Sequence, residues 1–566
     1  MSQPPLSSFP KYSGGAGAAP PPGRIAPGDP KPLLAIDALT LSIHGKPILR
    51  DLNLAIATGE ILALTGESGS GKSMTAFATI GLLPHGATHT GRIALDGTDL
   101  CTLTEPQLCA IRGKDIGMVF QEPMTALNPV QTIGAQVMET ILIHRAMPSA
   151  EAETRARDVL TRVGLPPDRF PLSRFPHELS GGQRQRVVIA MAIALRPKLL
   201  IADEPTTALD VTTQAQILDL LTGLVRQDGM ALMMITHDLA VVSDMADRIA
   251  VMKSGEIVEQ GETRQLFARM THPYTRALFE ASGHKVALPA PKDGPDPILQ
   301  VTRATRDYLK PRRLFQPRQS VRAVDDVSFT IHQGERVGLV GESGCGKSTL
   351  TRAILGLEPL QEGEIRAFGH PVWPALPGAL RSGLQVVFQD PYGSFNPRHR
   401  VARLVSEPFH LRPDPPTGAA RRKAVEDALV AVGLQPEDAD RHIHAFSGGQ
   451  RQRIAIARAL INAPELIIFD EAVSALDVRV RAQILDLIAE LSRHRNLAYL
   501  FISHDLSVVR TITDMVMVMQ AGRIVEHGPT ERVLTAPEHP YTRQLIAAAP
   551  KLPDIAGGPH AATPAL

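Results

Sequence analysis

The chain has 566 residues, too many for one hydrophobic core, so its length predicts several domains. Its 59 Lys and Arg residues balance 58 Asp and Glu residues, and no surplus of positive charge favours a nucleic acid as the main partner. The three cysteines, Cys101, Cys109 and Cys345, lack the spacing of a zinc site or of a disulfide framework, which favours a cytosolic protein.

The first residues, 1–32, are rich in Pro, Gly, Ala and Ser and lack the apolar segment of a signal peptide. We expect them to form a disordered tail. No stretch approaches the roughly 18–20 uninterrupted apolar residues of a membrane-spanning helix. If the protein acts at a membrane, we therefore expect other chains to span it.

Several motifs occur twice in the same order. GESGSGKS at Gly66–Ser73 returns as GESGCGKS at Gly341–Ser348, and SGGQRQR, an Asp–Glu pair, a His-Asp-Leu triplet and HPYTR are also repeated. A repeat this long indicates a duplicated domain. We place the first domain at residues 33–283 and the second at 297–552. They are joined by a Pro-rich exposed linker at 284–296, and a second loose tail covers 553–566.

Short apolar runs alternate with longer helical segments within each domain, which predicts an α/β fold. The run Ile61–Thr65 reads as a strand, the segment Ser73–Leu83 as the helix after a glycine-rich turn, and Leu199–Ala202 as another strand. The segment Pro148–Leu165 predicts a helical subdomain, with Ser149 as its cap and Gly164 at its end.

The sequence GxxxxGK[ST] follows an apolar strand and opens a helix in both copies, the context of a phosphate-binding P-loop. Its glycines let backbone N–H groups surround the phosphates, while Lys72 and Lys347 neutralise their charge. The candidate nucleotide contacts of the first copy are Gly66, Ser68, Gly69, Ser70, Gly71, Lys72, Ser73 and Met74. Those of the second copy are Gly341, Ser343, Gly344, Cys345, Gly346, Lys347, Ser348 and Thr349.

An Asp–Glu pair ends a buried-type run in each copy, which places two carboxylates at the edge of a sheet where α/β folds bind ligands. The aspartate can hold Mg²⁺ through water, and Glu204 or Glu471 can then polarise the attacking water. His237 and His504 follow these glutamates at one common distance, which favours a γ-phosphate contact.

The candidate metal ligands comprise hydroxyl, amide and carboxylate groups: Ser73, Gln121 and Asp203 in the first copy, Ser348, Gln389 and Asp470 in the second. For the two glutamines, the local sequence is equally compatible with two interpretations. Either the amide contacts the metal or its water, or the residue has no role in the site.

The SGGQ segments begin amphipathic helices, whose free N–H groups can receive an anion. This predicts a second phosphate site in each domain. Its residues are Ser180, Gly181, Gly182 and Gln183 in the first copy, and Ser447, Gly448, Gly449 and Gln450 in the second.

The order of P-loop, Gln loop, SGGQ, Asp–Glu and His resembles that of the ATP-binding-cassette (ABC) ATPases over nearly all of residues 33–552. The resemblance implies two P-loop NTPase domains, each with a RecA-like α/β core, an antiparallel β portion and a helical subdomain. It also implies a head-to-tail pair of sites that bind and hydrolyse ATP with Mg²⁺, each joining the P-loop of one cassette to the SGGQ of the other. Asp210 and Asp477 fall on the family's interdomain loop.

The Gln-loop sequences QEPMTALNP and QDPYGSFNP and the HPYTR tails resemble those of fused ATPase subunits of dipeptide, oligopeptide and microcin C importers. This implies two transmembrane permease subunits as partners and, through them, an extracytoplasmic substrate-binding protein. It also implies a peripheral location at the cytoplasmic face of a bacterial inner membrane, with membrane contact made through the partners.

Some positions depart from the family pattern. Ala472 stands where the first cassette has Pro205, so the turn after Glu471 is expected to be less rigid and the Glu471 site the slower of the two. Tyr308 is the candidate for stacking on adenine in the second cassette, whereas the first offers only Ile43–His44 near that place.

Two other functions remain open at this stage. Soluble tandem cassettes that act on ribosomes also lack membrane spans, but they resemble one another in a long charged helical linker, which this chain does not have. The catalytic motifs by themselves also permit an exporter ATPase or a purely regulatory ATP binder. We expect partner proteins, rather than this chain, to select the transported substrate.

Overall fold

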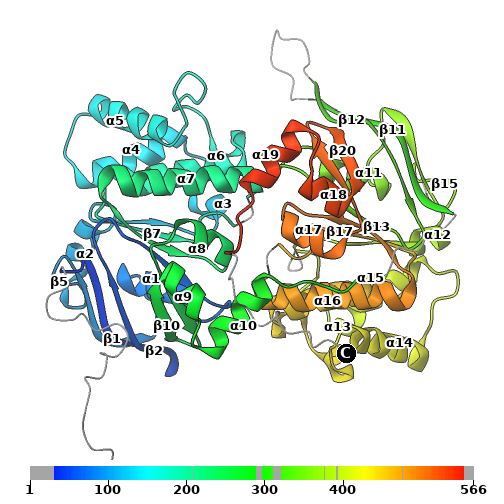
Figure 1. The fold of residues 1–566 in the computed structure, drawn as a ribbon, viewed down its shortest axis with the longest axis horizontal. Helices are drawn as coiled ribbons and strands as arrows, with labels where there is room; N and C mark the ends of the chain where they lie inside the picture. Colours follow the sequence, from blue (N-terminus) through cyan, green and yellow to red (C-terminus); the bar gives the residue numbers. More distant parts are fainter. Residues whose placement is uncertain are drawn as a thin grey trace, which may run out of the picture.

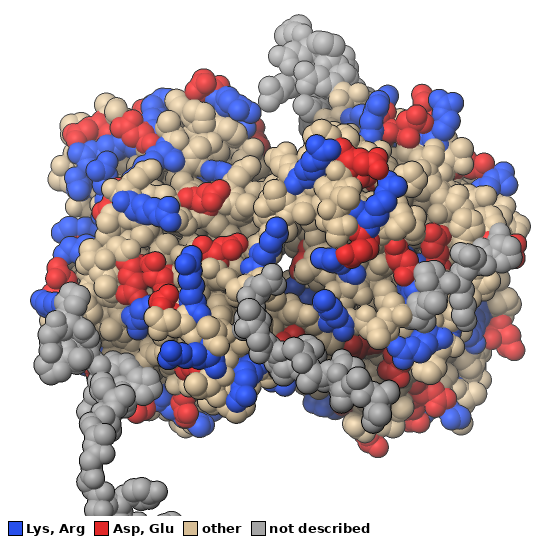
Figure 2. Space-filling view, in the orientation of Figure 1, with Lys and Arg blue, Asp and Glu red and all other residues tan. Residues whose placement is uncertain are grey.

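The structure is a computed structural model that describes residues 31–207, 209–288, 296–309, 320–374, 376–390, 393–474 and 476–553. Most of the two predicted tails and the middle of the predicted linker lie outside these residues. Within them, no helix combines the length and the apolar character needed to cross a membrane. Figure 2 shows that Lys and Arg side chains are interspersed with Asp and Glu over the viewed face.

Each half of the chain contains a small antiparallel sheet and a larger, mostly parallel one (Figure 1). In the first half, the small sheet has the order β2-β1-β4-β5 and the large one β10-β9-β3-β8-β7-β6. Its strands are β1 Leu34–Ile43, β2 Lys46–Ile56, β3 Ile61–Thr65, β4 Ala87–Leu95, β5 Thr98–Asp99, β6 Ile116–Val119, β7 Leu199–Asp203, β8 Ala231–Ile235, β9 Arg248–Lys253 and β10 Glu256–Glu262.

The second half repeats this topology, with the orders β12-β11-β14-β15 and β16-β17-β18-β13-β19-β20. Its strands are β11 Pro297–Leu309, β12 Ser320–His332, β13 Arg336–Val340, β14 Glu362–Ala367, β15 His370–Pro371, β16 Leu384–Val387, β17 Leu466–Asp470, β18 Ala498–Ile502, β19 Met515–Gln520 and β20 Arg523–Pro529. The first pair of strands is longer here than in the first half.

Helices surround the large sheets. Those of the first half are α1 Lys72–Thr79, α2 Glu105–Ile111, α3 Pro123–Ala126, α4 Ile133–His144, α5 Ser149–Arg162, α6 Gly181–Ile193, α7 Val211–Asp228, α8 Leu239–Met245, α9 Thr263–Arg269 and α10 Pro273–Ser282. Those of the second half are α11 Lys347–Ile354, α12 Gly378–Gly383, α13 Val401–Val405, α14 Gly418–Ala431, α15 Gly448–Leu460, α16 Val478–Arg495, α17 Leu506–Ile512, α18 Thr530–Thr535 and α19 Pro540–Ala548.

The predicted fold class is confirmed: both halves combine a parallel α/β core, an antiparallel sheet and a helical portion. Two local expectations differ from the structure. The helix after the first P-loop ends at Thr79 rather than Leu83, because Gly81 takes a left-handed conformation with φ +67°. Ser149 is the first helical residue of α5 and not its cap, which is Pro148.

The core of each half is divided by the large sheet. One cluster fills the space between the sheet and the helical portion, and another fills the space between the large and small sheets. The central strands β3 and β13 are buried along their full length. The loops that leave their carboxyl ends, the two P-loops, therefore start from rigid supports.

The two halves pack against each other through their C-terminal helices (Figure 1). Helix α10 contacts α16 of the second half, and α19 contacts α7 of the first. The predicted linker begins within this contact: His284 Nε2 lies 2.8 Å from Asp486 Oδ1, and Arg493 donates to the carbonyl of Ala287 at 3.0 Å. Its first residues therefore contact the second half, although Lys285 and Ala287 are exposed.

Candidate functional site

Each P-loop is a tight turn that only glycine can form at certain positions. Gly66 has φ +147°, and a Cβ there would lie 2.2 Å from the carbonyl oxygen of Met252. Gly341 has φ +154°, and a Cβ there would lie equally close to the carbonyl oxygen of Met519. The turn thus brings the loop backbone against the neighbouring strand and directs it into the following helix.

The P-loop lysines are buried and bonded to their own loops. Lys72 Nζ donates to the carbonyls of Gly66 at 2.8 Å and Glu67 at 2.9 Å. Lys347 Nζ makes the same two bonds in the second cassette, at 2.7 and 2.8 Å. Burial lowers the pKa of Lys72, against the opposing effect of the nearby Glu204 and Asp203. The ammonium group is thus held inside the cradle before a phosphate arrives.

The aspartates at the ends of β7 and β17 suit a cation. Asp203 is buried, its Oδ1 has no hydrogen-bond partner among the described residues, and Ser73 lies within hydrogen-bonding reach of its carboxylate. Burial raises the pKa of Asp203, and it raises that of Asp470 to about 6, with further help from the charge of Glu471. A hydroxyl and an unsatisfied carboxylate beside a phosphate cradle are the donors that Mg²⁺ prefers.

The next residue, Glu204, contacts polar side chains from three loops. It has a left-handed backbone, φ +46°. Its carboxylate accepts from Gln121 Nε2 at 2.9 Å and Thr207 Oγ1 at 2.9 Å, and its Oε1 lies 3.1 Å from His237 Nδ1. Burial alone would raise the pKa of Glu204, but the contacts with His237 and Thr207 lower it to about 2. The three predicted residues Gln121, Glu204 and His237 therefore meet.

The second cassette repeats this cluster with fewer contacts. Gln389 Nε2 donates to Glu471 Oε2 at 2.8 Å, and His504 Nδ1 lies 3.5 Å from the same oxygen. Ser474, in the place of Thr207, donates to the backbone carbonyl of Glu471 instead, at 2.9 Å. Burial opposes ionisation of Glu471, but its contact with His504 lowers the pKa overall.

The SGGQ segments form capped helix starts. The Ser180 side chain accepts from the N–H of Gln183 at 3.3 Å, and the Gln183 side chain accepts from the N–H of Ser180 at 3.0 Å. Ser447 and Gln450 form the same reciprocal cap. Both serines are exposed, so the positive ends of α6 and α15 are open to an anion.

Two glycines of each SGGQ segment differ in the space around them. A Cβ at Gly449 would lie 2.3 Å from Val480 Cγ1 on α16, whereas one at Gly448 would have nothing within 4 Å. We expect Gly449→Ala to lower the free energy of unfolding by about 1–3 kcal/mol relative to Gly448→Ala, since a β-branched neighbour on a helix cannot turn away freely. Urea unfolding of the two variants measures this, and equal midpoints would contradict it.

The loops after the Asp–Glu pairs, together with the first turns of α7 and α16 that follow them, bridge the cassettes; we call each of these segments a bridging loop. Asp210 Oδ2 accepts from the backbone N–H of Ser343 in the second P-loop at 3.3 Å, and Thr212 Oγ1 donates to Glu342 at 2.8 Å. On the other side, Arg479 Nη1 lies 2.7 Å from Glu67 Oε1 of the first P-loop. The sequence analysis identified Asp210 but not Thr212. The contact of Thr212 with Glu342 becomes visible only when both halves are packed together.

Between the cassettes lies a cavity of about 640 Å³. Both predicted histidines, His237 and His504, line it, together with residues of both bridging loops, among them Thr206 and Ser474. The two histidines predicted to contact the γ-phosphates therefore face one shared space.

Tyr308 lies near the end of β11, with its hydroxyl 3.5 Å from Thr349 Oγ1, which places it beside the second P-loop. In the first cassette, Ile43 holds the matching place at the end of β1, and His44 follows in a left-handed conformation, φ +47°. An aromatic side chain therefore lies beside the P-loop in the second cassette, whereas an aliphatic one holds the matching place in the first.

Two P-loops, each backed by an Asp–Glu pair at the end of a largely buried strand and faced by the bridging loop of the other half, define a tandem nucleoside triphosphatase. The family model "ABC transporter" matches residues 49–207 and 324–474, and the model "Oligopeptide/dipeptide transporter, C-terminal region" matches residues 258–288 and 525–561. The chain belongs to the ABC transporter family of ATP-binding proteins, and it binds and hydrolyses ATP.

Two similar transport ATP-binding proteins match nearly the whole chain, and a solved cassette matches part of it. The glutathione import ATP-binding protein GsiA of Salmonella paratyphi A is 45% identical, over 92% of this chain and 90% of that protein. The peptidoglycan transport ATP-binding protein YejF of Agrobacterium fabrum is also 45% identical, over 92% of this chain and 96% of its own length. A solved dimeric ATP-binding cassette, MJ0796 bound to ADP and Pi, is 33% identical, with a TM-score of 0.37 over 41% of this chain and 99% of that one.

Proposed function

We propose that this protein powers an importer of peptides or peptide-like compounds by hydrolysing ATP at two sites shared between its cassettes. The printed functions of the two relatives, glutathione import and peptidoglycan transport, support a peptide-like substrate. The match to the oligopeptide/dipeptide transporter C-terminal region in both cassettes supports the same class.

The observation that carries the shared-site proposal is the contact of each bridging loop with the opposite P-loop. Asp210 reaches Ser343, and Arg479 reaches Glu67, so each P-loop is bounded by the other cassette. In the proposed arrangement, Lys72 and Ser73 combine with Ser447–Gln450, while Lys347 and Ser348 combine with Ser180–Gln183.

The residues present fit a magnesium ion in each site. Asp203 and Ser73 would hold it in the first site and Asp470 and Ser348 in the second, and the ion would neutralise phosphate charge during transfer. Gln121 and Gln389 remain candidates for the same shell, although their amides bond to Glu204 and Glu471 in this structure.

Each side chain of the site has its own proposed role in hydrolysis. Lys72 binds the phosphates, the ionised Glu204 accepts the proton of the attacking water, and His237 orients the γ-phosphate. In this structure Glu204 is bonded to both Gln121 and His237, so these contacts must loosen for a water to reach the carboxylate. Lys347, Glu471 and His504 have the same proposed roles in the second site.

We also propose two transmembrane permease subunits as partners and, beyond them, an extracytoplasmic substrate-binding protein. This would place the chain at the cytoplasmic face of the inner membrane, held there by its partners. Exposed apolar side chains near the Gln loops and helical subdomains support a docking surface: Phe120 is 40% exposed, Ile143 71% and Phe388 39%.

We expect the purified chain to recover two very hydrophobic proteins from detergent-solubilised membranes of its source. Ile143→Asp should reduce this recovery, because it places a charge on the proposed docking surface. Leu357→Asp changes a residue that is 56% exposed beside the antiparallel sheet and should not reduce it. Mass spectrometry of the recovered proteins makes the measurement, and recovery of ribosomes in their place would count against import.

A further inference from the structure

Tyr308 is tied to the second P-loop through its hydroxyl. Besides approaching Thr349 at 3.5 Å, this hydroxyl donates to the carboxylate of Glu358. Thr349 directly follows the P-loop residue Ser348, so the ring has a fixed place relative to the phosphate cradle. Tyr308 stays partly exposed on β11.

Glu358 is itself fixed by two guanidinium groups. Arg306 Nε lies 3.4 Å from Glu358 Oε2, and Arg352 Nη1 lies 3.5 Å from its Oε1. The guanidinium carbon of Arg306 lies 5.0 Å from the centre of the Tyr308 ring, a cation–π contact. The side chains of Arg306 and Glu358 are only 16% and 21% exposed, so solvent screens their attraction weakly.

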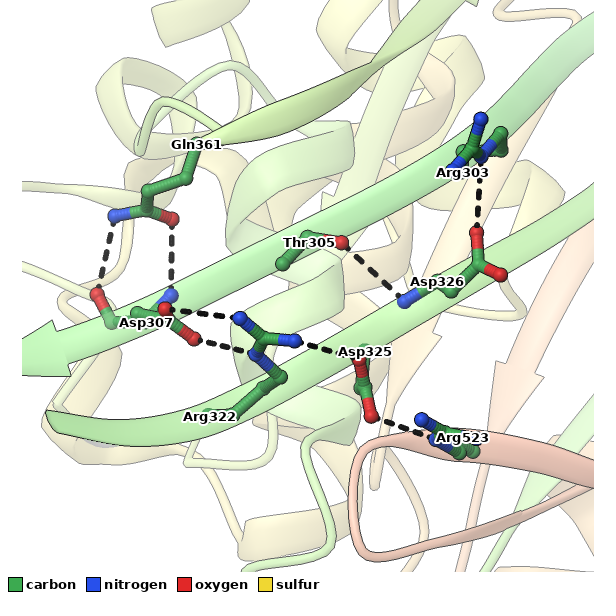
Figure 3. A network of polar contacts seen from close by, with 8 residues as sticks. All are labelled: Arg303, Thr305, Asp307, Arg322, Asp325, Asp326, Gln361 and Arg523. Carbon is green, nitrogen blue, oxygen red and sulfur yellow. Dashed lines mark hydrogen bonds and ion pairs between the residues drawn. The ribbon is translucent and has the colours of Figure 1, made fainter.

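The strand that carries Tyr308 is anchored at the preceding residue, Asp307 (Figure 3). The Gln361 side chain accepts from the N–H of Asp307 at 2.9 Å and donates to its carbonyl at 3.1 Å. Arg322, on the neighbouring strand, donates to the Asp307 carboxylate at 3.0 Å and to Asp325 at 3.2 Å. Both the ring and its backbone are thereby held before any nucleotide binds.

We call the four contacting side chains of the second cassette the clamp: Arg306, Tyr308, Arg352 and Glu358. In the first cassette, strand register and distance from the P-loop align these residues with apolar ones: Leu41, Ile43, Phe77 and Leu83. These four side chains all belong to or pack against one hydrophobic cluster of the first cassette. The two nucleotide sites thus differ in chemistry on the side beside the first antiparallel strand.

We infer that Glu358 is a positioning residue that holds Tyr308 as a stacking platform for the nucleotide base, so that the base contributes more to binding at the second site than at the first. The inference rests on the proposed ATP sites. Stacking on an aromatic ring is sensitive to the placement of that ring, and the loss of one stacked base weakens binding by about tenfold.

The test uses the full chain with Lys72→Ala, so that nucleotide binding reports the second site. Dissociation constants are measured for ATP and for tripolyphosphate, which has the phosphates but no base. Glu358→Leu, which introduces the residue of the first cassette, should weaken ATP binding about tenfold and leave tripolyphosphate binding unchanged. Glu358→Gln keeps an acceptor for the Tyr308 hydroxyl and should recover most of the affinity.

Two further variants define the comparison. Glu364→Leu removes an exposed carboxylate of the same sheet, paired with Arg366, and should change neither constant. Tyr308→Ala should match Glu358→Leu, and the two together should lose no more than either alone. The ratio of ATP to tripolyphosphate affinity should also be higher with Lys72→Ala than with Lys347→Ala, which leaves only the first site.

Each alternative outcome is distinct. If Glu358→Leu weakens ATP and tripolyphosphate equally, Glu358 supports the P-loop rather than the base, and the inference is wrong. An unchanged ATP constant, or equal affinity ratios for the two sites, also overturns it. A chain that binds no ATP in either lysine background would refute the proposed function instead.

Discussion

Glu204→Gln and Glu471→Gln should each slow ATP hydrolysis at their own site by roughly 10²–10⁴-fold while leaving nucleotide binding intact. The amide keeps the shape of the side chain but cannot accept the proton of the attacking water. At neutral pH the wild-type carboxylate is ionised, because its contacts with His237 and Thr207 hold the pKa of Glu204 at about 2. Single-turnover hydrolysis and nucleotide trapping measure the two effects separately.

The control for this pair is Glu153→Gln, on the surface of α5, where the carboxylate pairs with Arg157 four residues away. It should hydrolyse ATP at the wild-type rate. The double variant of Glu204 and Glu471 should retain ATP in a closed form. Rapid turnover by that variant would remove the general-base assignment for both residues.

The single variant Glu204→Gln also tests which cassette completes which site. With Glu204→Gln retaining nucleotide at the first P-loop, Ser447→Arg should release it, whereas Ser180→Arg should not. The reason is that the first P-loop already contacts the second cassette through Arg479 and Glu67. If Ser180→Arg releases the nucleotide instead, each cassette works alone and the shared-site proposal is wrong.

The glutamate sites are also expected to differ in rate, with the Glu471 site the slower. Ala472 replaces the rigid Pro205 of the first turn, and Ser474 bonds to the backbone rather than to the carboxylate that Thr207 holds. The carboxylate of Glu471 thus has fewer fixed contacts. Equal rates of the two single variants would contradict this expectation.

Lys72→Ala and Lys347→Ala should weaken ATP binding at their own sites by about 10- to 100-fold, the equivalent of one or two charge-assisted hydrogen bonds. Both ammonium groups are buried in the cradle and held by two loop carbonyls, so each substitution removes a charge that is already positioned for the phosphates. Hydrolysis should fall strongly in each variant and nearly vanish in the double variant.

Fluorescent-nucleotide titration and phosphate release give the two readouts. Lys198→Ala is the matched control, because that ammonium group is half exposed and pairs with Asp96 on the surface. Circular dichroism establishes that the variants remain folded. Unchanged turnover in the double variant would refute hydrolysis at these P-loops.

The sequence by itself determined the chemistry that lies in short contiguous motifs. A P-loop is specified locally, because glycine alone tolerates the positive φ and close approach at Gly66 and Gly341. The aspartate of each Asp–Glu pair ends a strand that is otherwise apolar, so the place of the pair at the sheet edge could be inferred as well. The duplication, the fold class and the family could be predicted from the sequence for the same reason.

Only the tertiary structure decided which distant groups meet. Thr212 and Glu342 are far apart in the chain, and their contact depends on how the two halves pack. The clamp of Arg306 and Glu358 around Tyr308 joins a strand to the segment after a helix, and single-sequence patterns carry no signal for such side-chain pairs. Motifs fix local backbone geometry, whereas the differences between the two sites arise from packing among residues that the sequence keeps apart.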